Sequence, residues 1–335
     1  MSANCTNAPD AVPSDAGVAG VGVLLSFIIT AGISLVISAS LIFQEARGRS
    51  SSESVLRRKL LNSYSDQQIL TGIGIQSIGL AKVSSIVPYH FFLIWMLSLL
   101  SMAVHNATLL ALARDFRRDW VLRWMRQLLM LANLVLSCVY GVYILRAVER
   151  GVNDRTFAVA CVWDARTPSF APSDNYALSF AGTIVVIAAN VVTFALATWY
   201  LHSRAQRFYV VFQVVGTLLM CGSAVGATVR VAYLAAAFGR GPPIALSDNG
   251  ESLWSFGQLL SVGMLLLPLV SVVEIVRGEI RCAPPVAQDY DDDKGVLLGE
   301  GEQQELRARP GPGVSRAADF QPNPFWGSQT NLFRK

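Results

Sequence analysis

The chain has 335 residues, of which 53% are hydrophobic and 15% are charged, and its mean hydropathy is +0.44. Values this apolar are typical of a chain embedded in a lipid bilayer and argue against an ordinary water-soluble domain. The net charge is only +4, the chain holds few lysines, and no long basic run occurs in it. No nucleic-acid partner is therefore expected.

Six apolar stretches are each long enough to cross the hydrocarbon core as a helix, which takes about 20 residues. They cover 17–43, 88–113, 121–147, 177–201, 208–236 and 253–276. A seventh stretch, 66–82, is shorter and rich in glycine, but a span there keeps the arginine-rich connections on one side of the membrane. We therefore predict an all-α polytopic transmembrane bundle of seven spans over 17–276, with a short N-terminus, 1–16, and a tail, 277–335.

The basic residues predict the orientation, because Lys and Arg near span ends are retained on the cytosolic side. The N-terminal segment through Asp15 has no basic residue. The connections that fall on the other side hold Arg47, Arg49, Arg57, Arg58, Lys59, Arg114, Arg117, Arg118, Arg123, Arg126, Arg204, Arg207, Arg277 and Arg281. The N-terminus is thus predicted to lie outside the cytosol and the C-terminus inside it.

The first span is too long for the core of a signal peptide and no basic stretch precedes it, so it is predicted to be an uncleaved anchor. Asn4-Cys5-Thr6 is then a glycosylation sequon on the extracytosolic side. Cys5 and Cys161 both fall on that side, so a disulfide between them is permitted by compartment. The five cysteines show no paired metal spacing, and neither a metal nor a cofactor is expected.

Between the first two spans, Ser54–Leu61 alternates apolar and basic positions at helical spacing. This favours either a short helix lying on the anionic cytosolic leaflet or a solvated loop. Ser65 or Asp66 would make a good N-cap for the span that follows. Glycine patterns that allow close helix approach occur on the second and sixth spans, at Gly72, Gln76 and Gly79 and at Gly222, Gly226 and Arg230.

The third span carries a polar stripe of Ser98, Ser101, His105 and Thr108, spaced three and four residues apart on one helix face. One interpretation is a hydrogen-bonding wall for a ligand, with His105 as its titratable member. The other is a set of interhelical polar contacts, which membrane bundles use routinely. Further polar groups toward the cytosolic side could converge with this stripe: Asp66, Gln67, Gln68, Asn106 and Glu274.

Arg230 in the sixth span cannot lose its charge, so it needs an acidic partner, carbonyl oxygens or a route to the membrane interface by snorkelling. Snorkelling is the simplest of these. Lys82, His90 and Gln258 lie toward the same side, so an anion or a polar head group could also be bound there.

After Arg281 the composition changes to Pro, Gly, Gln, Asp and Arg, which predicts a disordered cytosolic tail. In this tail Asn323-Pro324-Phe325 resembles the Asn-Pro-Phe ligands of Eps15-homology domains. That resemblance implies an endocytic partner and residence at the plasma membrane or an endosome.

Three segments carry a wider resemblance: Leu61–Ile73, with the pattern SDQQxxTGI, Tyr89–Phe92, with YHFF, and Asp119–Trp124, with DWVLRW. They are similar to a large group of uncharacterised multi-spanning membrane proteins of filamentous fungi. The resemblance implies the architecture and a fungal origin, but no reaction, substrate or catalytic residue.

The last span contains no lysine for retinal, and the chain lacks P-loop, HExxH and GxSxG motifs. We therefore expect a non-enzymatic receptor-like or scaffold protein of the plasma membrane or an endomembrane. Its partners would be membrane lipids, an apolar or amphipathic small ligand and cytosolic proteins. The alternatives are a membrane enzyme that uses the polar groups around His105 on an apolar metabolite, and a transporter.

Overall fold

The computed structural model describes residues 5–47, 54–118, 120–170, 176–202, 209–239 and 242–277. Within these ranges the chain is helical, and its sheet-like pairing is confined to one bridge between Val12 and Leu246. Five helices are long and apolar enough to cross a membrane: Ala16–Ala46, Pro88–Ala111, Arg123–Glu149, Tyr176–His202 and Tyr209–Leu234. The predicted all-α class is confirmed.

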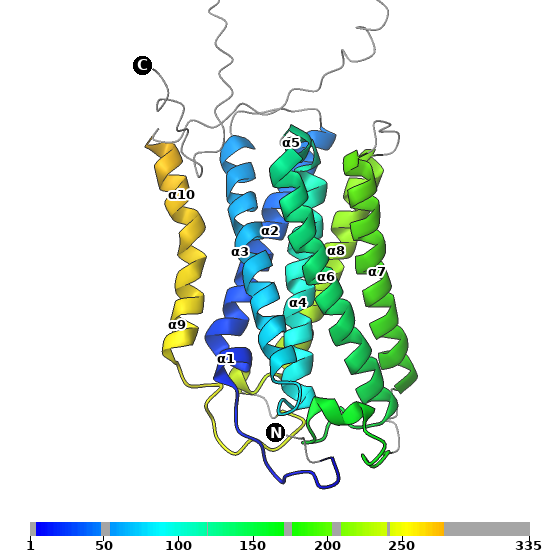
Figure 1. Cartoon of the computed structure of the whole chain (residues 1–335). Coiled ribbons are helices and arrows are strands. Elements are labelled where there is room, and N and C mark those ends of the chain that lie inside the picture. Colours follow the sequence, from blue (N-terminus) through cyan, green and yellow to red (C-terminus); the bar gives the residue numbers. More distant parts are fainter. Residues whose placement is uncertain are drawn as a thin grey trace, which may run out of the picture.

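Two further helical segments lie alongside these five (Figure 1). The helix α3 runs without interruption over Ser54–Ala81. The last segment consists of α9 (Phe256–Gly263), a short 3-10 turn (Met264–Leu266) and α10 (Leu267–Val276). The continuity of α3 corrects two predictions. Its polar first half is neither a separate surface helix nor a loop, and Ser65 and Asp66 lie inside the helix instead of capping it.

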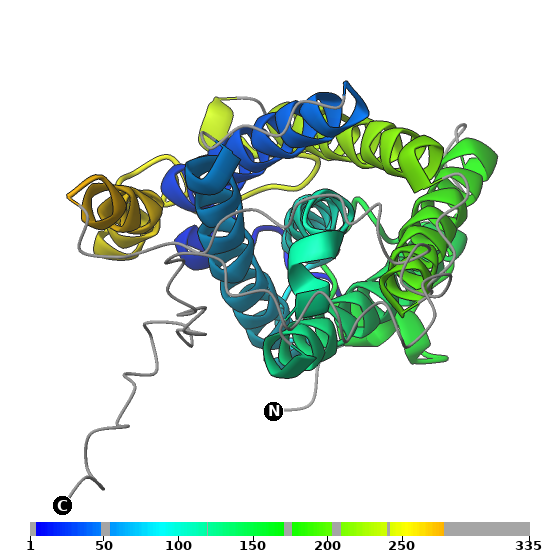
Figure 2. The same cartoon turned by 90° about the horizontal axis from the view of Figure 1, so that it is seen from above.

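The helix α4 (Pro88–Ala111) stands at the centre of the bundle. Figure 2 shows it surrounded by α2 (Val21–Ala46), α3, α6 (Trp120–Glu149), α7 (Tyr176–His202) and α8 (Tyr209–Leu234). The consecutive helices α9 and α10 lie outside this ring, α9 against α2 and α10 against α3. The apolar window of α4 is 100% buried, whereas that of α7 is 28% buried, so α4 is enclosed by protein and α7 lies at the surface.

The third predicted span, 88–113, ends earlier than expected. The helix α4 ends before Leu112, and a short helix, α5 (Ala113–Arg118), follows. The first span begins with a short helix, α1 (Ala16–Ala19), that is separated from α2 by Gly20. The other long apolar stretches match their helices to within a few residues, whereas the seventh stretch, 66–82, is only the second part of α3.

The outer surface of the bundle is apolar, as a lipid-facing surface must be. Large hydrophobic side chains such as Leu178 and Val225 are exposed on α7 and α8. Exposed tryptophans occur near both ends of the bundle, with Trp124 and Trp199 at one end and Trp163 and Trp254 at the other. Tryptophan is enriched at both membrane interfaces, so this surface fits a bilayer.

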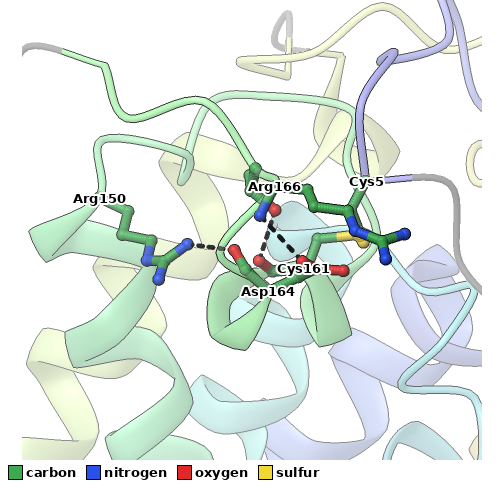
Figure 3. The surroundings of a disulfide bond; sticks show 6 residues. Cys5, Arg150, Cys161, Asp164 and Arg166 are labelled. Atoms are coloured by element: carbon green, nitrogen blue, oxygen red, sulfur yellow. Dashed lines mark hydrogen bonds between the residues drawn. A yellow bond between two sulfur atoms is a disulfide. The ribbon is translucent and has the colours of Figure 1, made fainter.

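The two ends of the bundle differ. At the end that we call the disulfide end, Cys5 and Cys161 form a disulfide with their Cα atoms 5.4 Å apart, the pairing that the sequence permitted (Figure 3). This bond fastens the N-terminal segment to the loop between α6 and α7. At the opposite end, which we call the arginine end, α2 stops beside Arg47, α3 starts near Arg57 and α6 starts near Arg123.

The N-terminal segment is also joined to the loop between α8 and α9. The backbone of Val12 exchanges hydrogen bonds with Ala245 and Ser247, at 3.1 and 2.8 Å. The hydroxyl of Ser14 donates to the carboxylate of Asp248, and this hydrogen bond is the main cause that lowers the pKa of Asp248. The disulfide end is therefore covered by segments that are distant in sequence and bound to one another.

Candidate functional site

A cavity of about 620 Å³ lies between α4, α6, α7 and α8. Its size is within the range of small-molecule sites in proteins, about 300–1,000 Å³. The central helix contributes aromatic and apolar side chains to its wall: Tyr89, Phe92, Trp95, Met96 and Leu99. Most of the wall is apolar, so the cavity suits the hydrocarbon part of a ligand.

Glycines of α7 and α8 leave this space open. A Cβ atom added to Gly182, Gly222 or Gly226 would have no neighbour within 4 Å, and all three residues line the cavity. Gly222 and Gly226 of α8 therefore do not bring helices close together, which corrects the prediction made for them. In agreement, α7 packs against α6 and α4 more extensively than it packs against α8.

The wall of the cavity carries opposite charges near the disulfide end. Arg230 lies about one turn before the end of α8, and Asp154 lies in the loop that follows α6. Neither side chain has an ion pair or hydrogen bond to any residue that the structure describes. Asn153 lines the same region. The cavity thus combines an apolar body with a charged end.

Deeper in the wall, three lining residues carry a buried polar atom that lacks a hydrogen-bond partner among the described residues. These atoms are Trp95 Nε1, Asn190 Oδ1 and Ser223 Oγ. The amide nitrogen of Asn190 donates to the carbonyl of Val186 at 2.9 Å, so the oxygen is the atom left unpaired. Buried polar groups without partners are uncommon in folded proteins. Others occur elsewhere among the described residues, for example at Ser34 and Gln127, and these three lie beside the cavity.

The polar stripe of α4 serves a different purpose, because it connects α4 to α3 and α6. Ser98 Oγ lies 3.0 Å from Ser137 Oγ of α6. Ser101 Oγ donates to the carbonyl of Gln68 on α3 at 2.9 Å and accepts from Asn133 of α6 at 3.3 Å. These contacts support the interpretation of the stripe as interhelical polar contacts.

Gln76 completes this connection by donating to Asn133 Oδ1 at 2.5 Å. The close approach predicted for α3 occurs here, since a Cβ atom added to Gly72 would collide with Ser101, and one added to Gly79 would collide with Tyr140. The three helices therefore meet along a seam of glycines and amides.

His105 is fully buried, lies 2.9 Å from Ser101 Oγ through Nε2, and does not line the cavity. Asn106 donates to the sulfur of Met220 at 3.4 Å. Asp66 does not join them, because it forms an ion pair with Arg126. The side chain of Glu274 lies outside the described part of the structure, so the predicted convergence of polar groups is only partly observed.

The polar groups expected near Arg230 do not assemble around a common ligand. Lys82 forms an ion pair with Asp15 at 2.8 Å. His90 Nε2 lies 2.6 Å from the carboxylate of Glu251.

Gln258 is satisfied by the backbone, since it accepts from the N–H of Gly22 at 3.2 Å and donates to the carbonyl of Leu253 at 3.0 Å. Of the four predicted members, only Arg230 remains without a partner among the described residues.

Several residues of these sites were missed from the sequence. Glu251 is 1% exposed in its side chain and also accepts from the hydroxyl of Tyr89 at 3.0 Å, yet it lies in a loop without any pattern. Asn133 and Ser137, in contrast, are four residues apart on α6, and this spacing was a usable signal. Asp154 and Asn190 had no distinguishing sequence context.

Other predicted features cannot be placed. Asn4 of the sequon and the motif Asn323-Pro324-Phe325 lie outside the described residues. Within the described ranges, no group of three or more His, Cys, Asp or Glu side chains is arranged to hold a metal ion. Comparison of the chain with protein-family models, curated proteins and solved structures gives no match.

Proposed function

We propose that this chain is a seven-span, receptor-like membrane protein that binds an amphipathic small molecule in the cavity between α4, α6, α7 and α8. The cavity is the observation that carries the proposal. It is mainly apolar, of suitable size, and lined by charged and unpaired polar groups, as expected of a site for an amphipathic ligand.

The count of seven rests on α3 and on the segment formed by α9 and α10. The 28 residues of α3 span about 42 Å, and the stretch 256–276 spans about 31 Å, against about 30 Å for the hydrocarbon core. Both segments run between the same two ends as the five apolar helices (Figure 1). Together with those five they give seven crossings.

For the orientation, we propose that the disulfide end is extracytosolic and the arginine end cytosolic. Disulfides persist in oxidising compartments, which favours the Cys5–Cys161 end on the outside. The basic residues at the helix ends favour the opposite end in the cytosol. Protease added to intact cells that carry the chain at their surface should digest a tag at the N-terminus and spare one at the C-terminus; digestion of both tags would contradict an odd number of crossings.

Ligand binding is tested by measuring what the purified protein retains. The full chain is extracted in mild detergent, and bound amphiphiles are quantified by mass spectrometry. Gly222→Leu places a side chain in the cavity, whereas Gly32→Leu places the same side chain in open space on α2, away from the cavity. We expect the wild type and Gly32→Leu to retain an amphiphile that Gly222→Leu loses. Equal retention by all three would refute the cavity as the site.

A further inference from the structure

We propose that the cavity binds a zwitterionic phospholipid, with its phosphate at Arg230, its ammonium group at Asp154 and one acyl chain between α4, α7 and α8. This inference rests on the proposed function, because it names the ligand class of the same cavity. It goes beyond that function by assigning a role to each of the two charged residues.

The first support is the pairing of charges at the disulfide end. Two pairs of other charged side chains there bind each other: Lys82 pairs with Asp15 at 2.8 Å, and Arg146 pairs with Glu149 at 2.7 Å. Arg230 has no such partner among the described residues, although it lines a largely apolar cavity. A guanidinium stays charged under all ordinary conditions, and at membrane depth an anion stabilises it.

The second support is that the same cavity wall also carries an unpaired carboxylate, that of Asp154, which has no partner among the described residues. A ligand with only an anionic head would be repelled by Asp154, and an uncharged head would leave both residues without a partner. A head group with a phosphate and an ammonium group offers each residue a group of opposite charge. Charge complementarity therefore favours a zwitterionic head.

The third support is the shape of the cavity. Its wall follows α8 from Leu218 to Leu234, a distance of about 24 Å along the helix. The hydrocarbon of one leaflet is about 15 Å thick, half of the full core, so this length accommodates an acyl chain as well as a head group. Phe92, Met96 and Leu99 provide apolar contacts for the chain.

The cavity is also reachable from the bilayer. Four of its lining residues, two on α7 and two on α8, are largely exposed: Leu178, Val185, Leu218 and Leu219. The helices α7 and α8 also pack against each other less extensively than either packs against α4, so a lipid can enter sideways between them without crossing the covered disulfide end. Because Arg230 and Asp154 lie at that end, the lipid would come from the leaflet on that side.

The competing explanation for Arg230 is snorkelling, in which the guanidinium extends to the interface and binds no ligand. Under that explanation, Arg230 and Asp154 would not influence which head group is bound. Binding of a series of lipids with one common acyl chain therefore separates the two explanations.

The experiment measures competition binding to the full chain in mild detergent, with radiolabelled lysophosphatidylethanolamine as the probe. The competitors are unlabelled lysophosphatidylethanolamine, lysophosphatidic acid, which lacks the ammonium group, and monoacylglycerol, which lacks both charges. We expect the zwitterion to bind the wild type most tightly and monoacylglycerol most weakly. Each charge should contribute roughly fivefold in affinity, which corresponds to about 1 kcal/mol.

Substitutions of the two charged residues test which part of the head group each residue binds. Arg230→Gln should remove the preference for the phosphate, so that lysophosphatidic acid binds no better than monoacylglycerol. Asp154→Asn should make the zwitterion bind no better than lysophosphatidic acid. Gly222→Leu should weaken the binding of all three lipids, whereas Gly32→Leu should not change the binding of any of them.

The outcomes distinguish the two proposals. If monoacylglycerol binds the wild type as tightly as the zwitterion, or if neither charge variant alters the order, the head-group inference is overturned while the cavity remains a binding site. If no saturable binding of any of the three lipids occurs and the purified protein retains no amphiphile, the proposed function falls as well.

Discussion

The side chain of Asn133 joins three helices, and its replacement tests whether this seam holds the bundle together. Asn133 lies on α6, accepts a hydrogen bond from Gln76 of α3 and donates to Ser101 and to the sulfur of Met102 on α4. The variant Asn133→Leu keeps the approximate volume of the side chain and removes all three hydrogen bonds. We expect it to destabilise the bundle without changing the number of crossings.

The expected magnitude follows from the two stronger of these interhelical hydrogen bonds, those with Gln76 and Ser101, because sulfur is a weak acceptor. Such bonds in membrane proteins contribute about 0.6 kcal/mol on average and about 1.7 kcal/mol at most, so the pair gives about 1–3 kcal/mol. The lower half of this range is favoured, because both partners keep other hydrogen bonds. Gln76 still donates to the carbonyl of Gly72 at 3.0 Å, and Ser101 still donates to the carbonyl of Gln68 at 2.9 Å.

Reversible unfolding in mixed micelles of mild and denaturing detergent measures this change. The matched control is Thr108→Val, because Thr108 is also fully buried on α4 but its hydroxyl bonds within its own helix, to the carbonyl of Val104 at 2.7 Å. We expect a smaller loss of stability for Thr108→Val than for Asn133→Leu. Equal losses would mean that the seam acts only through burial and would refute the argument from interhelical hydrogen bonds.

Three further changes test other contacts in the same unfolding assay. Cys5→Ser removes the disulfide, so a reducing agent should lower the stability of the wild type and leave the variant unchanged; a reductant effect on both would argue against this bond as its source. Glu251→Ala leaves the buried ring of His90 without its hydrogen-bond acceptor and should lower the stability by about 1–3 kcal/mol; an unchanged stability would show that this contact does not stabilise the bundle. Gly79→Leu should destabilise by at least about 1–3 kcal/mol through overpacking, while Gly32→Leu should have little effect; similar values for the two would contradict the close approach of α3 and α6.

The long apolar helices could be predicted from the sequence because the bilayer sets their length. A helix that crosses about 30 Å of hydrocarbon needs an apolar run that composition alone reveals. The helix α3 shows the limit of this approach. Its first half carries Arg57, Arg58 and Lys59, and no hydropathy signal reports that the helix continues through them. The ion pair of Arg58 with Asp115, at 2.6 Å, belongs to the tertiary structure and could not be anticipated.

The candidate cavity was harder to predict, because glycines that share one helix face have opposite surroundings on α3 and on α8. Gly72 and Gly79 on α3 approach neighbouring helices so closely that a Cβ atom would collide, whereas Gly222 and Gly226 on α8 face open space. The sequence shows that a side chain is absent in both cases. It does not show whether a neighbouring helix or a ligand fills the space that is left.

The two faces of α4 explain why the clearest sequence signal did not mark the candidate site. Polar groups that face another helix in a bilayer must find partners there, so the contacts of Ser98 and Ser101 recur at helical spacing and leave a periodic pattern. A ligand site instead needs side chains that the protein leaves without partners, and such side chains need not recur at helical spacing. On α4 the regular polar spacing therefore indicates helix contact, and the residues proposed to bind a ligand, Arg230 and Asp154, belong to no regular pattern of contacts.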